Sequence, residues 1–230
     1  MPNLIGGLNG EALAESLGLA EVVPDAHADY RPLVVDAMFF FLERLSPARL
    51  TAIIAEQFNL PEATSSTYRL ALLFRRCPTL HKLGQVVARD RRLTRELREN
   101  LQGLESLAPT TPLEAITAII RQEWGQVAGL EIASEALAEA SVAVVVPFVW
   151  RDSQQSAPRQ GVFKVLRPGI EEQMHEELAI WSAIGPFLEE HCAIQGLPAL
   201  DYRNNLDSVC WLLANEIRLD HEQTHLARAT

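Results

Sequence analysis

Apolar side chains recur every three or four residues along most of the first 127 positions, which is the spacing of amphipathic helices. One stripe follows Pro32, because proline favours the first turn of a helix. A second stripe begins at Pro47 and stops before Pro61, and a third covers 67–74. The pattern therefore predicts that residues 1–127 are helical.

The last two helices of this region are predicted from the spacing of leucines and isoleucines. One helix carries leucines at positions 93, 97, 101 and 104 on a single face. The other begins at Thr111-Pro112, and its buried stripe is expected to consist of Ile116, Ile119, Ile120 and Trp124.

The middle of the chain has a different pattern. Valines crowd the segment 141–150, and β-branched residues of this kind favour strands. A polar hairpin loop is expected at 151–160 and a second strand at 161–166. Pro147 lies inside the first strand, where it indicates a sheet edge or a bulge.

Helical spacing returns after this hairpin. We predict one helix over 170–191 and a last helix from Tyr202 to about position 229. The first of these helices carries a polar group that we expect on a solvated face: Glu171, Glu172, His175, Glu176 and Glu177. The expected fold class is α+β, mostly α, with a small antiparallel sheet.

Composition and charge narrow the function classes. With 48% hydrophobic and 22% charged residues the chain has a globular composition, and its net charge of -10 argues against a nucleic-acid partner. The three widely spaced cysteines are expected to be buried thiols in a reducing compartment. No apolar run reaches the roughly 20 residues that a membrane span needs. We therefore expect a cytoplasmic protein.

One basic run stands out in this acidic chain. Its members are Arg89, Arg91, Arg92, Arg95 and Arg98. The favoured interpretation is a solvated helix face paired with neighbouring glutamates. The alternative is a contact with anionic lipid headgroups or with a partner, which would make the protein peripheral to a membrane surface.

Lys164 is the first candidate for chemistry, because it lies inside the second predicted strand. A strand lysine is costly to bury unless its ammonium group reaches a partner. In kinase-like folds such a lysine holds the α- and β-phosphates of ATP and pairs with a helix glutamate. An exposed lysine on a two-sided strand is the simpler explanation. The neighbouring motifs must therefore decide whether Lys164 binds phosphates.

Three further stretches, taken together with Lys164, resemble the UbiB/AarF/ADCK family of atypical protein-kinase-like proteins. The segment 82–85 matches the K-x-G-Q motif of that family's helical extension. The segment 138–141 resembles its alanine-rich A-A-A-S loop with one change, and 166–172 is similar to its V-Q-R-P-G-I-E-E stretch. The resemblance covers about residues 72–230.

The resemblance implies a set of site residues. The nucleotide-binding residues would be Lys164, Glu222, Ala138, Ala140 and Ser141. Glu222 would be the ion-pair partner of Lys164. The regulatory residues would be Lys82, Gln85 and Glu216, of which Lys82 and Glu216 would block the substrate side of the pocket. Arg218 stands where the family has an aspartate, and Glu139 is expected to bring a repelling carboxylate near the phosphates.

The resemblance also implies a domain organisation and an activity. We expect a helical N-terminal region of unknown role at 1–70, a helical extension at 71–127 and a kinase-like N-lobe at 128–230, with the C-lobe absent. Family members are atypical kinases or ATPases, many linked to ubiquinone or other isoprenoid lipids. The expected ligand is therefore ATP or ADP with Mg. Since the catalytic-loop and metal-binding aspartates are missing, we expect no phosphoryl transfer from this chain alone.

Two other functions stay open. The first is a non-catalytic regulatory or interaction module, a pseudokinase remnant that binds no nucleotide. The second is a zinc hydrolase, because His221-Glu222-x-x-His225 matches the H-E-x-x-H helix motif. There the two histidines would bind zinc and Glu222 would be the general base, but a third protein ligand is missing.

Overall fold

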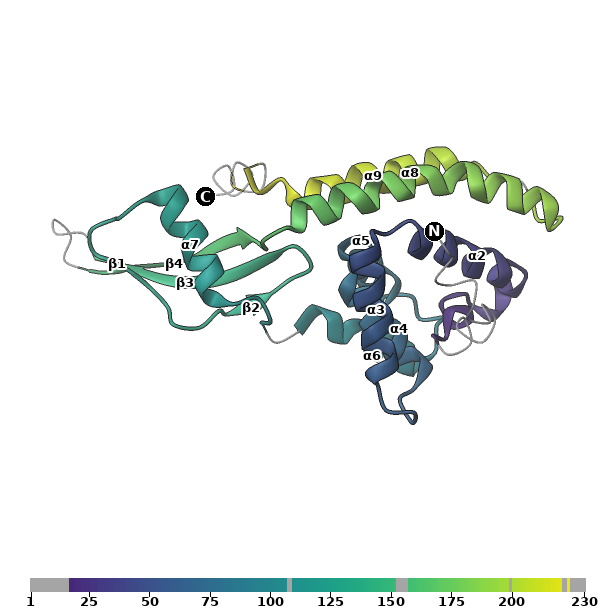
Figure 1. Cartoon of the computed structure of the whole chain (residues 1–230), viewed down its shortest axis with the longest axis horizontal. Coiled ribbons are helices and arrows are strands. Elements are labelled where there is room, and N and C mark those ends of the chain that lie inside the picture. Colours follow the sequence, from purple (N-terminus) through teal and green to yellow (C-terminus); the bar gives the residue numbers. More distant parts are fainter. Residues whose placement is uncertain (1–16, 107–108, 152–156, 199, 221–222, 224–230) are drawn as a thin grey trace. The chain divides into compact units, whose positions relative to one another are not determined.

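The computed structural model describes residues 17–106, 109–151, 157–198, 200–220 and 223, and it is mostly helical with a small antiparallel sheet (Figure 1). The chain forms two compact units, one from Met1–Leu104 with Gln173–Ala214 and one from Glu105–Glu172 with Asn215–Thr230. This division by contacts does not follow the chain order. The regions expected at 1–70, 71–127 and 128–230 stay a prediction.

The first unit is built from helices. They are η1 (Leu19–Val22), η2 (Asp25–Tyr30), α2 (Arg31–Glu43), α3 (Pro47–Asn59), α4 (Ser66–Arg76), α5 (Pro78–Val87), α6 (Arg95–Gln102), most of α8 (Ile170–Ile194) and α9 (Tyr202–Ala214). The helices predicted after Pro32, after Pro47 and over 67–74 are confirmed as α2, α3 and α4. A short 3-10 helix, η3 (Gly103–Ser106), follows α6.

Helices α8 and α9 run antiparallel as a hairpin within this unit. The thiol of Cys192 donates to the Tyr202 hydroxyl at 3.0 Å near the connection. Further along, a Cβ on Gly185 would lie 3.0 Å from the Cα of Arg203, so the two helices approach closely. Cys77 and Cys192 are buried as expected, whereas Cys210 is only half-buried, which corrects the expectation of three buried thiols.

The last helix is shorter than predicted. Helix α9 ends at Ala214 and the 3-10 helix η4 (Asn215–Ile217) follows, closed by a hydrogen bond from Arg218 N to Asn215 O at 3.0 Å. Asparagine competes with the backbone for hydrogen bonds and favours such interruptions. The prediction of a continuous helix to about 229 is therefore wrong, and Glu216 lies in η4.

The second unit contains the sheet. Strand β3 (Ala143–Trp150) is its central strand, and β4 (Arg159–Leu166) pairs with its whole length. The other edge of β3 pairs with β1 (Leu130–Ile132) and then with β2 (Ala138–Glu139). The two strands predicted at 141–150 and 161–166 are confirmed, and the two short strands were not predicted.

Pro147 lies opposite a break between β1 and β2 on that edge. Residues 133–137 face only Val146 and Pro147 of β3. The Pro147 carbonyl still accepts a hydrogen bond from Ala133 N at 2.9 Å, and the missing proline N–H falls where the ladder is interrupted. Strand β3 itself runs through Pro147 without a bulge against β4 and is a central strand, so the expectation of an edge or a bulge in this strand is corrected to a break between β1 and β2 beside it.

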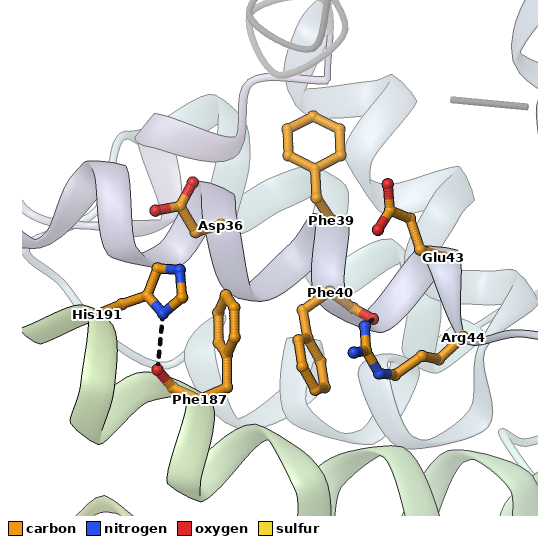
Figure 2. A pocket seen from close by; sticks show the side chains of 7 residues that line it. All are labelled: Asp36, Phe39, Phe40, Glu43, Arg44, Phe187 and His191. Carbon is orange, nitrogen blue, oxygen red and sulfur yellow. Dashed lines mark hydrogen bonds between the residues drawn. The ribbon is translucent and has the colours of Figure 1, made fainter. Parts of the chain in front are cut away.

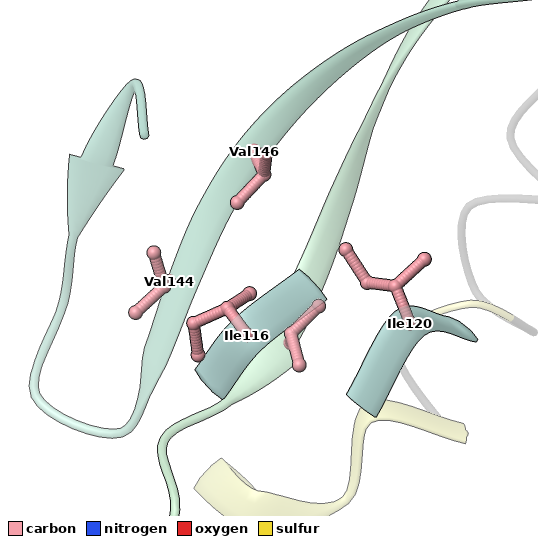
Figure 3. Packing of buried hydrophobic residues seen from close by; sticks show 5 residues of the cluster. Ile116, Ile120, Val144 and Val146 are labelled. Atoms are coloured by element: carbon pink, nitrogen blue, oxygen red, sulfur yellow. The ribbon is translucent and has the colours of Figure 1, made fainter. Parts of the chain in front are cut away.

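Helix α7 (Leu113–Trp124) covers one face of the sheet. Ile116 and Ile120 pack against Val144, Val146 and Val165 to form the core of this unit (Figure 3). Trp124 was expected in the same stripe but is 57% exposed. Trp124 is the last residue of the helix, and the Phe163 ring meets it edge-on at 5.1 Å between centroids.

Candidate functional site

The predicted phosphate-binding residues meet on the sheet face opposite to α7. Lys164 pairs with Val145 across β3 and β4, and Val145 pairs with Ala138 across β3 and β2. Directly paired residues of antiparallel strands point to the same face, so these three form one row. Their neighbour Val165 is buried against α7, which places the row on the other face.

Apolar side chains lie beside the lysine on this face. Val162 precedes Lys164 by two residues on β4 and is 54% exposed, and Val145 is half-buried. Lys164 itself is exposed. Two valines next to an ammonium group form a surface that a flat ring and an anionic group could occupy together.

The alanine-rich stretch is a strand end followed by a tight turn. Ala138 lies in β2, and Ala140 N donates to Ala143 O at 2.8 Å to close the turn into β3. Ser141 is at the tip of this turn and is buried. The stretch thus connects two strands of the sheet.

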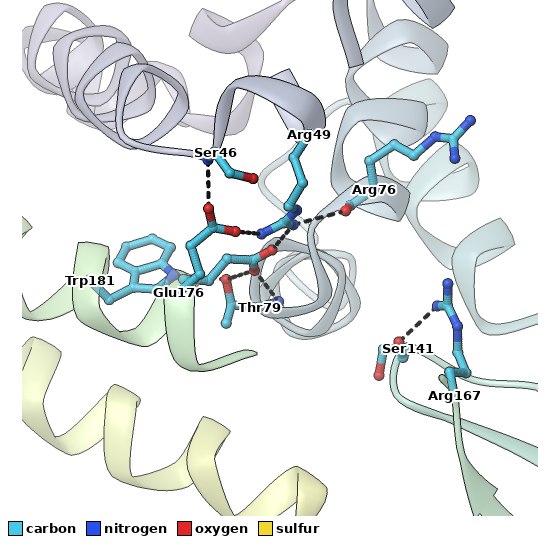
Figure 4. Close-up of polar contacts among 9 residues, drawn as sticks. Ser46, Arg49, Arg76, Thr79, Ser141, Arg167, Glu176 and Trp181 are labelled. Atoms are coloured by element: carbon cyan, nitrogen blue, oxygen red, sulfur yellow. Dashed lines mark hydrogen bonds and ion pairs between the residues drawn. The ribbon is translucent and has the colours of Figure 1, made fainter. Parts of the chain in front are cut away.

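Arg167 clamps this turn from the end of β4. Its backbone N donates to Val142 O at 2.9 Å, and its Nη1 donates to Ser141 O at 3.0 Å, as Figure 4 shows for the second contact. Its Nε lies 3.4 Å from a carboxylate oxygen of Glu139. The arginine of the R-P-G stretch therefore has a structural role in joining β4 to the turn.

Glu139 lies on the α7 face and holds the start of that helix. Its carboxylate accepts hydrogen bonds from Thr110 N at 2.6 Å, from Thr111 N at 2.8 Å and from the Thr110 hydroxyl at 3.1 Å. Burial opposes ionisation, but the amides of Thr111 and Thr110 prevail and lower the pKa of Glu139. The expectation that Glu139 repels phosphates beside Lys164 is wrong, because it points to the opposite face.

The K-x-G-Q motif lies in helix α5, within the first unit. Lys82 and Gln85 are both half-buried and three residues apart on this helix. A Cβ on Gly84 would come within 2.7 Å of the Phe74 ring, so α5 and α4 can pack this closely only with glycine there. The glycine of the motif thus has a packing role that the sequence did not indicate.

A buried polar network in the first unit was missed by the sequence analysis. Glu177 of α8 is fully buried and accepts hydrogen bonds from Thr79 N at 2.9 Å, from the Thr79 hydroxyl at 2.5 Å and from Arg49. Trp181 Nε1 donates to the Thr79 hydroxyl at 2.8 Å. Because Thr79 lies in the first turn of α5, Glu177 caps that helix from α8.

Glu176 has the same role for helix α3. It accepts from Ser46 N, the N-cap residue, at 2.5 Å, and Arg49 Nη1 donates to it at 2.5 Å. Burial raises the pKa of Glu177 despite Arg49, whereas for Glu176 burial is outweighed by Arg49 and Ser46, which lower its pKa. The predicted solvated face is therefore wrong for Glu176 and Glu177. It holds for Glu171, Glu172 and His175, which are exposed.

The remaining predicted residues are only partly described. Glu216 is half-buried in η4, and Arg218 forms an ion pair with Asp220 at 3.2 Å. Glu222, His221 and His225 lie outside the described residues, so the predicted lysine partner and the zinc motif stay predictions. Within the described part of the chain, no three His, Cys, Asp or Glu side chains gather into a metal site.

The basic run has the arrangement expected of a solvated surface. Arg92 pairs with Asp90 at 2.7 Å and Arg95 with Glu99 at 2.6 Å, and these arginines are exposed. No helix among those the structure describes is both long and apolar enough to cross a membrane.

Comparison with known proteins adds no assignment. The chain matches no family model and no curated protein, and its structure matches no solved structure.

Proposed function

We propose that this chain carries part of a nucleotide site of a UbiB-like atypical kinase or ATPase, with Lys164 binding the phosphates of ATP or ADP with Mg. The observation that supports the proposal is the strand register. It brings Ala138, Val145 and Lys164 into one row on the sheet face opposite to α7. Ala138 and Lys164, which belong to two motifs that are distant in sequence, thus share one surface.

The chemistry of this surface suits a nucleotide. A base would lie on the side chains of Val145 and Val162, and the Lys164 ammonium would reach the phosphates as a point charge. The small side chain of Ala138 leaves the backbone of β2 open to the ligand. Arg167 would hold the turn at Ser141 in place while the ligand binds.

The remaining roles follow from the family resemblance. Lys82 and Gln85 on α5, with Glu216 on η4, would regulate access to the site, and Glu222 would pair with Lys164. Phosphoryl transfer would need catalytic-loop and metal-binding aspartates from a C-lobe. A link to isoprenoid lipids at a membrane surface belongs to the same proposal.

The test is thermal melting of the chain in Mg-ATP and Mg-ADP. A ligand that binds only the native state at 100 times its Kd adds about 2.7 kcal/mol of stability and raises the Tm. Lys164→Ala should remove most of this shift. Arg159→Ala is the matched control, because Arg159 is an exposed cation of the same strand on the other face. No shift at millimolar nucleotide, or equal shifts for both variants, would contradict the proposal.

A second candidate is a non-catalytic interaction module. It is favoured by the structural roles of three motif residues, since Gly84 packs on Phe74, Arg167 clamps the turn and Ser141 is buried in it. On this hypothesis the motifs are kept for folding alone. Nucleotide would then leave the Tm unchanged, while Gly84→Ala would lower the free energy of unfolding by about 1–3 kcal/mol through overpacking.

A further inference from the structure

A pocket between helices α2 and α8 of the first unit has none of the described site residues in its lining. Its volume is about 330 Å³, which is within the range of small-molecule sites. Its lining residues, labelled in Figure 2, are Asp36, Phe39, Phe40, Glu43, Arg44, Phe187 and His191.

Aromatic rings form the apolar part of this pocket. The Phe40 and Phe187 centroids are 4.4 Å apart, and the Phe187 and His191 centroids are 3.8 Å apart. The guanidinium of Arg44 already lies over the Phe40 ring, 3.3 Å from its centroid. The aromatic surface is thus of the kind that attracts cations through ring quadrupoles.

Acidic groups flank these rings. Asp36 and Glu43 are seven residues apart on α2, which puts them on one side of the helix two turns from each other. Figure 2 shows their carboxylates on opposite sides of the pocket, with the phenylalanine rings between them. Only Arg44 among the lining residues carries a permanent positive charge, so acidic groups outnumber it two to one.

His191 supplies one further acceptor. Its Nδ1 lies 3.0 Å from the Phe187 carbonyl, which can only accept, so Nδ1 is the donor. In the neutral ring Nε2 is then an acceptor. The pocket therefore combines aromatic faces with three groups that accept hydrogen bonds from an ammonium ion.

We propose that this pocket binds an organic cation, a ligand with an aromatic or apolar body and an ammonium group. The body would lie against the Phe39 ring and the edges of the Phe40 and Phe187 rings, because the faces of those two rings already pack on Arg44, on each other and on His191. The ammonium would bind Asp36 or Glu43. The chain's net charge of -10 would favour such a cation over an anion at long range. The proposal is independent of the nucleotide site, because a nucleotide has the opposite charge and the pocket lining includes none of the described residues predicted to bind it.

The test is titration of the whole chain with three probes that share one ring, followed by saturation-transfer NMR and calorimetry. The probes are tryptamine, the neutral alcohol tryptophol and the anion indole-3-propionate. Tryptamine should bind in the millimolar range or tighter, and the other two should bind more weakly by up to about fivefold, as one lost ion pair predicts. Equal affinities, or no binding of tryptamine, would overturn the proposal.

Three variants locate the binding. The double variant Asp36→Asn with Glu43→Gln should weaken tryptamine binding by up to about tenfold, because both carboxylates are lost. Arg44→Gln should strengthen it, since it removes a competing cation from the Phe40 ring. Glu190→Gln is the control on α8, an exposed glutamate that does not line the pocket.

Melting curves of the variants show that the fold is retained, so that a loss of binding reports on the pocket. Unchanged affinity in the double variant, or weaker binding in Arg44→Gln, would show that tryptamine does not bind as proposed. If Glu190→Gln lost as much tryptamine affinity as the double variant, the effect would come from the net charge of the chain and not from the pocket. That result would also overturn the proposal.

Discussion

Each of the two units holds the start of a helix with a glutamate from a distant part of the chain, beside an arginine. In the first unit Glu177 of α8 binds the first turn of α5, and Arg49 lies next to it. In the second unit Glu139 of β2 binds the amides that precede α7, and Arg167 lies next to it. Helix N-termini leave backbone N–H groups without partners, and in both cases a remote carboxylate satisfies them.

The two glutamates differ in how burial and hydrogen bonding balance. Glu177 is fully buried, and loss of solvent raises its pKa in spite of Arg49 and Thr79. Glu139 is less enclosed, and the two amides that donate to it lower its pKa. The same capping arrangement therefore favours the ionised carboxylate in one unit and disfavours it in the other. The surroundings of a cap, and not its residue types, decide how it responds to pH.

The largest expected effect on stability comes from replacing Arg49, which lies beside Glu177 at the start of α5. Arg49→Met would leave Glu177 buried without its counter-charge, and we expect a loss of about 3–5 kcal/mol in the free energy of unfolding. Urea denaturation followed by circular dichroism measures it. Adding Glu177→Gln to Arg49→Met should restore part of the loss, because the uncompensated charge is then gone.

Arg167→Met is the matched change in the second unit. The Arg167 side chain is 27% exposed, and Glu139 keeps its amide donors and some solvent, so the loss should be clearly smaller than for Arg49→Met. Equal losses in the two variants would contradict the difference in burial between the two caps.

The pH dependence of the two caps should have opposite signs. The folded pKa of Glu139 lies below its ordinary 4.5, so its stabilisation is complete above that value and is lost as the pH falls through the folded pKa. The folded pKa of Glu177 lies above 4.5, so its contribution is complete below the ordinary value and is lost as the pH rises through the folded pKa.

Melting curves of the chain and of two variants between roughly pH 3 and pH 7 measure this difference. Above pH 4.5 the variant Glu139→Gln should be less stable than the unchanged chain by about 1.5–3 kcal/mol, the range for hydrogen bonds to a charged group. That gap should close in acid. For Glu177→Gln the gap should instead shrink as the pH rises. Two gaps that move in the same direction would show that the caps do not differ as described.

Much of the fold could be predicted because its signals are local. Pro32 and Pro47 mark the starts of α2 and α3, and the valines of 141–150 indicate β3. The short strands β1 and β2 carry no such signal, since they form only by pairing with β3. Trp124 was misplaced because helical spacing does not tell where the covered sheet ends.

The candidate site was predictable only as a set of motifs. Sequence gives no means to know that Glu139 and Lys164 point to opposite faces, because that depends on the register of β2 against β3. The position of Glu177 in the sequence does carry a signal of the cap at α5. Glu177 lies three residues after Met174 and four before Trp181, in the apolar stripe of α8, where a solvated carboxylate would not belong.

The smallest expected effect on stability comes from removing a single hydroxyl group beside each capping glutamate. The Thr79 hydroxyl is buried, donates to Glu177 and accepts from Trp181, so Thr79→Val leaves both partners short of a hydrogen bond. We expect a loss of about 1–2 kcal/mol, the cost of unsatisfied buried polar groups.

Thr110→Val is the matched variant in the second unit. The Thr110 hydroxyl is exposed and lies 3.1 Å from Glu139, which keeps both backbone amides and can bind water instead. The change should stay within about 0.5 kcal/mol, as for other surface positions. Urea denaturation of both variants gives the two values. If Thr110→Val cost as much as Thr79→Val, the cap at α7 would be as enclosed as the cap at α5, and the contrast between the units would disappear.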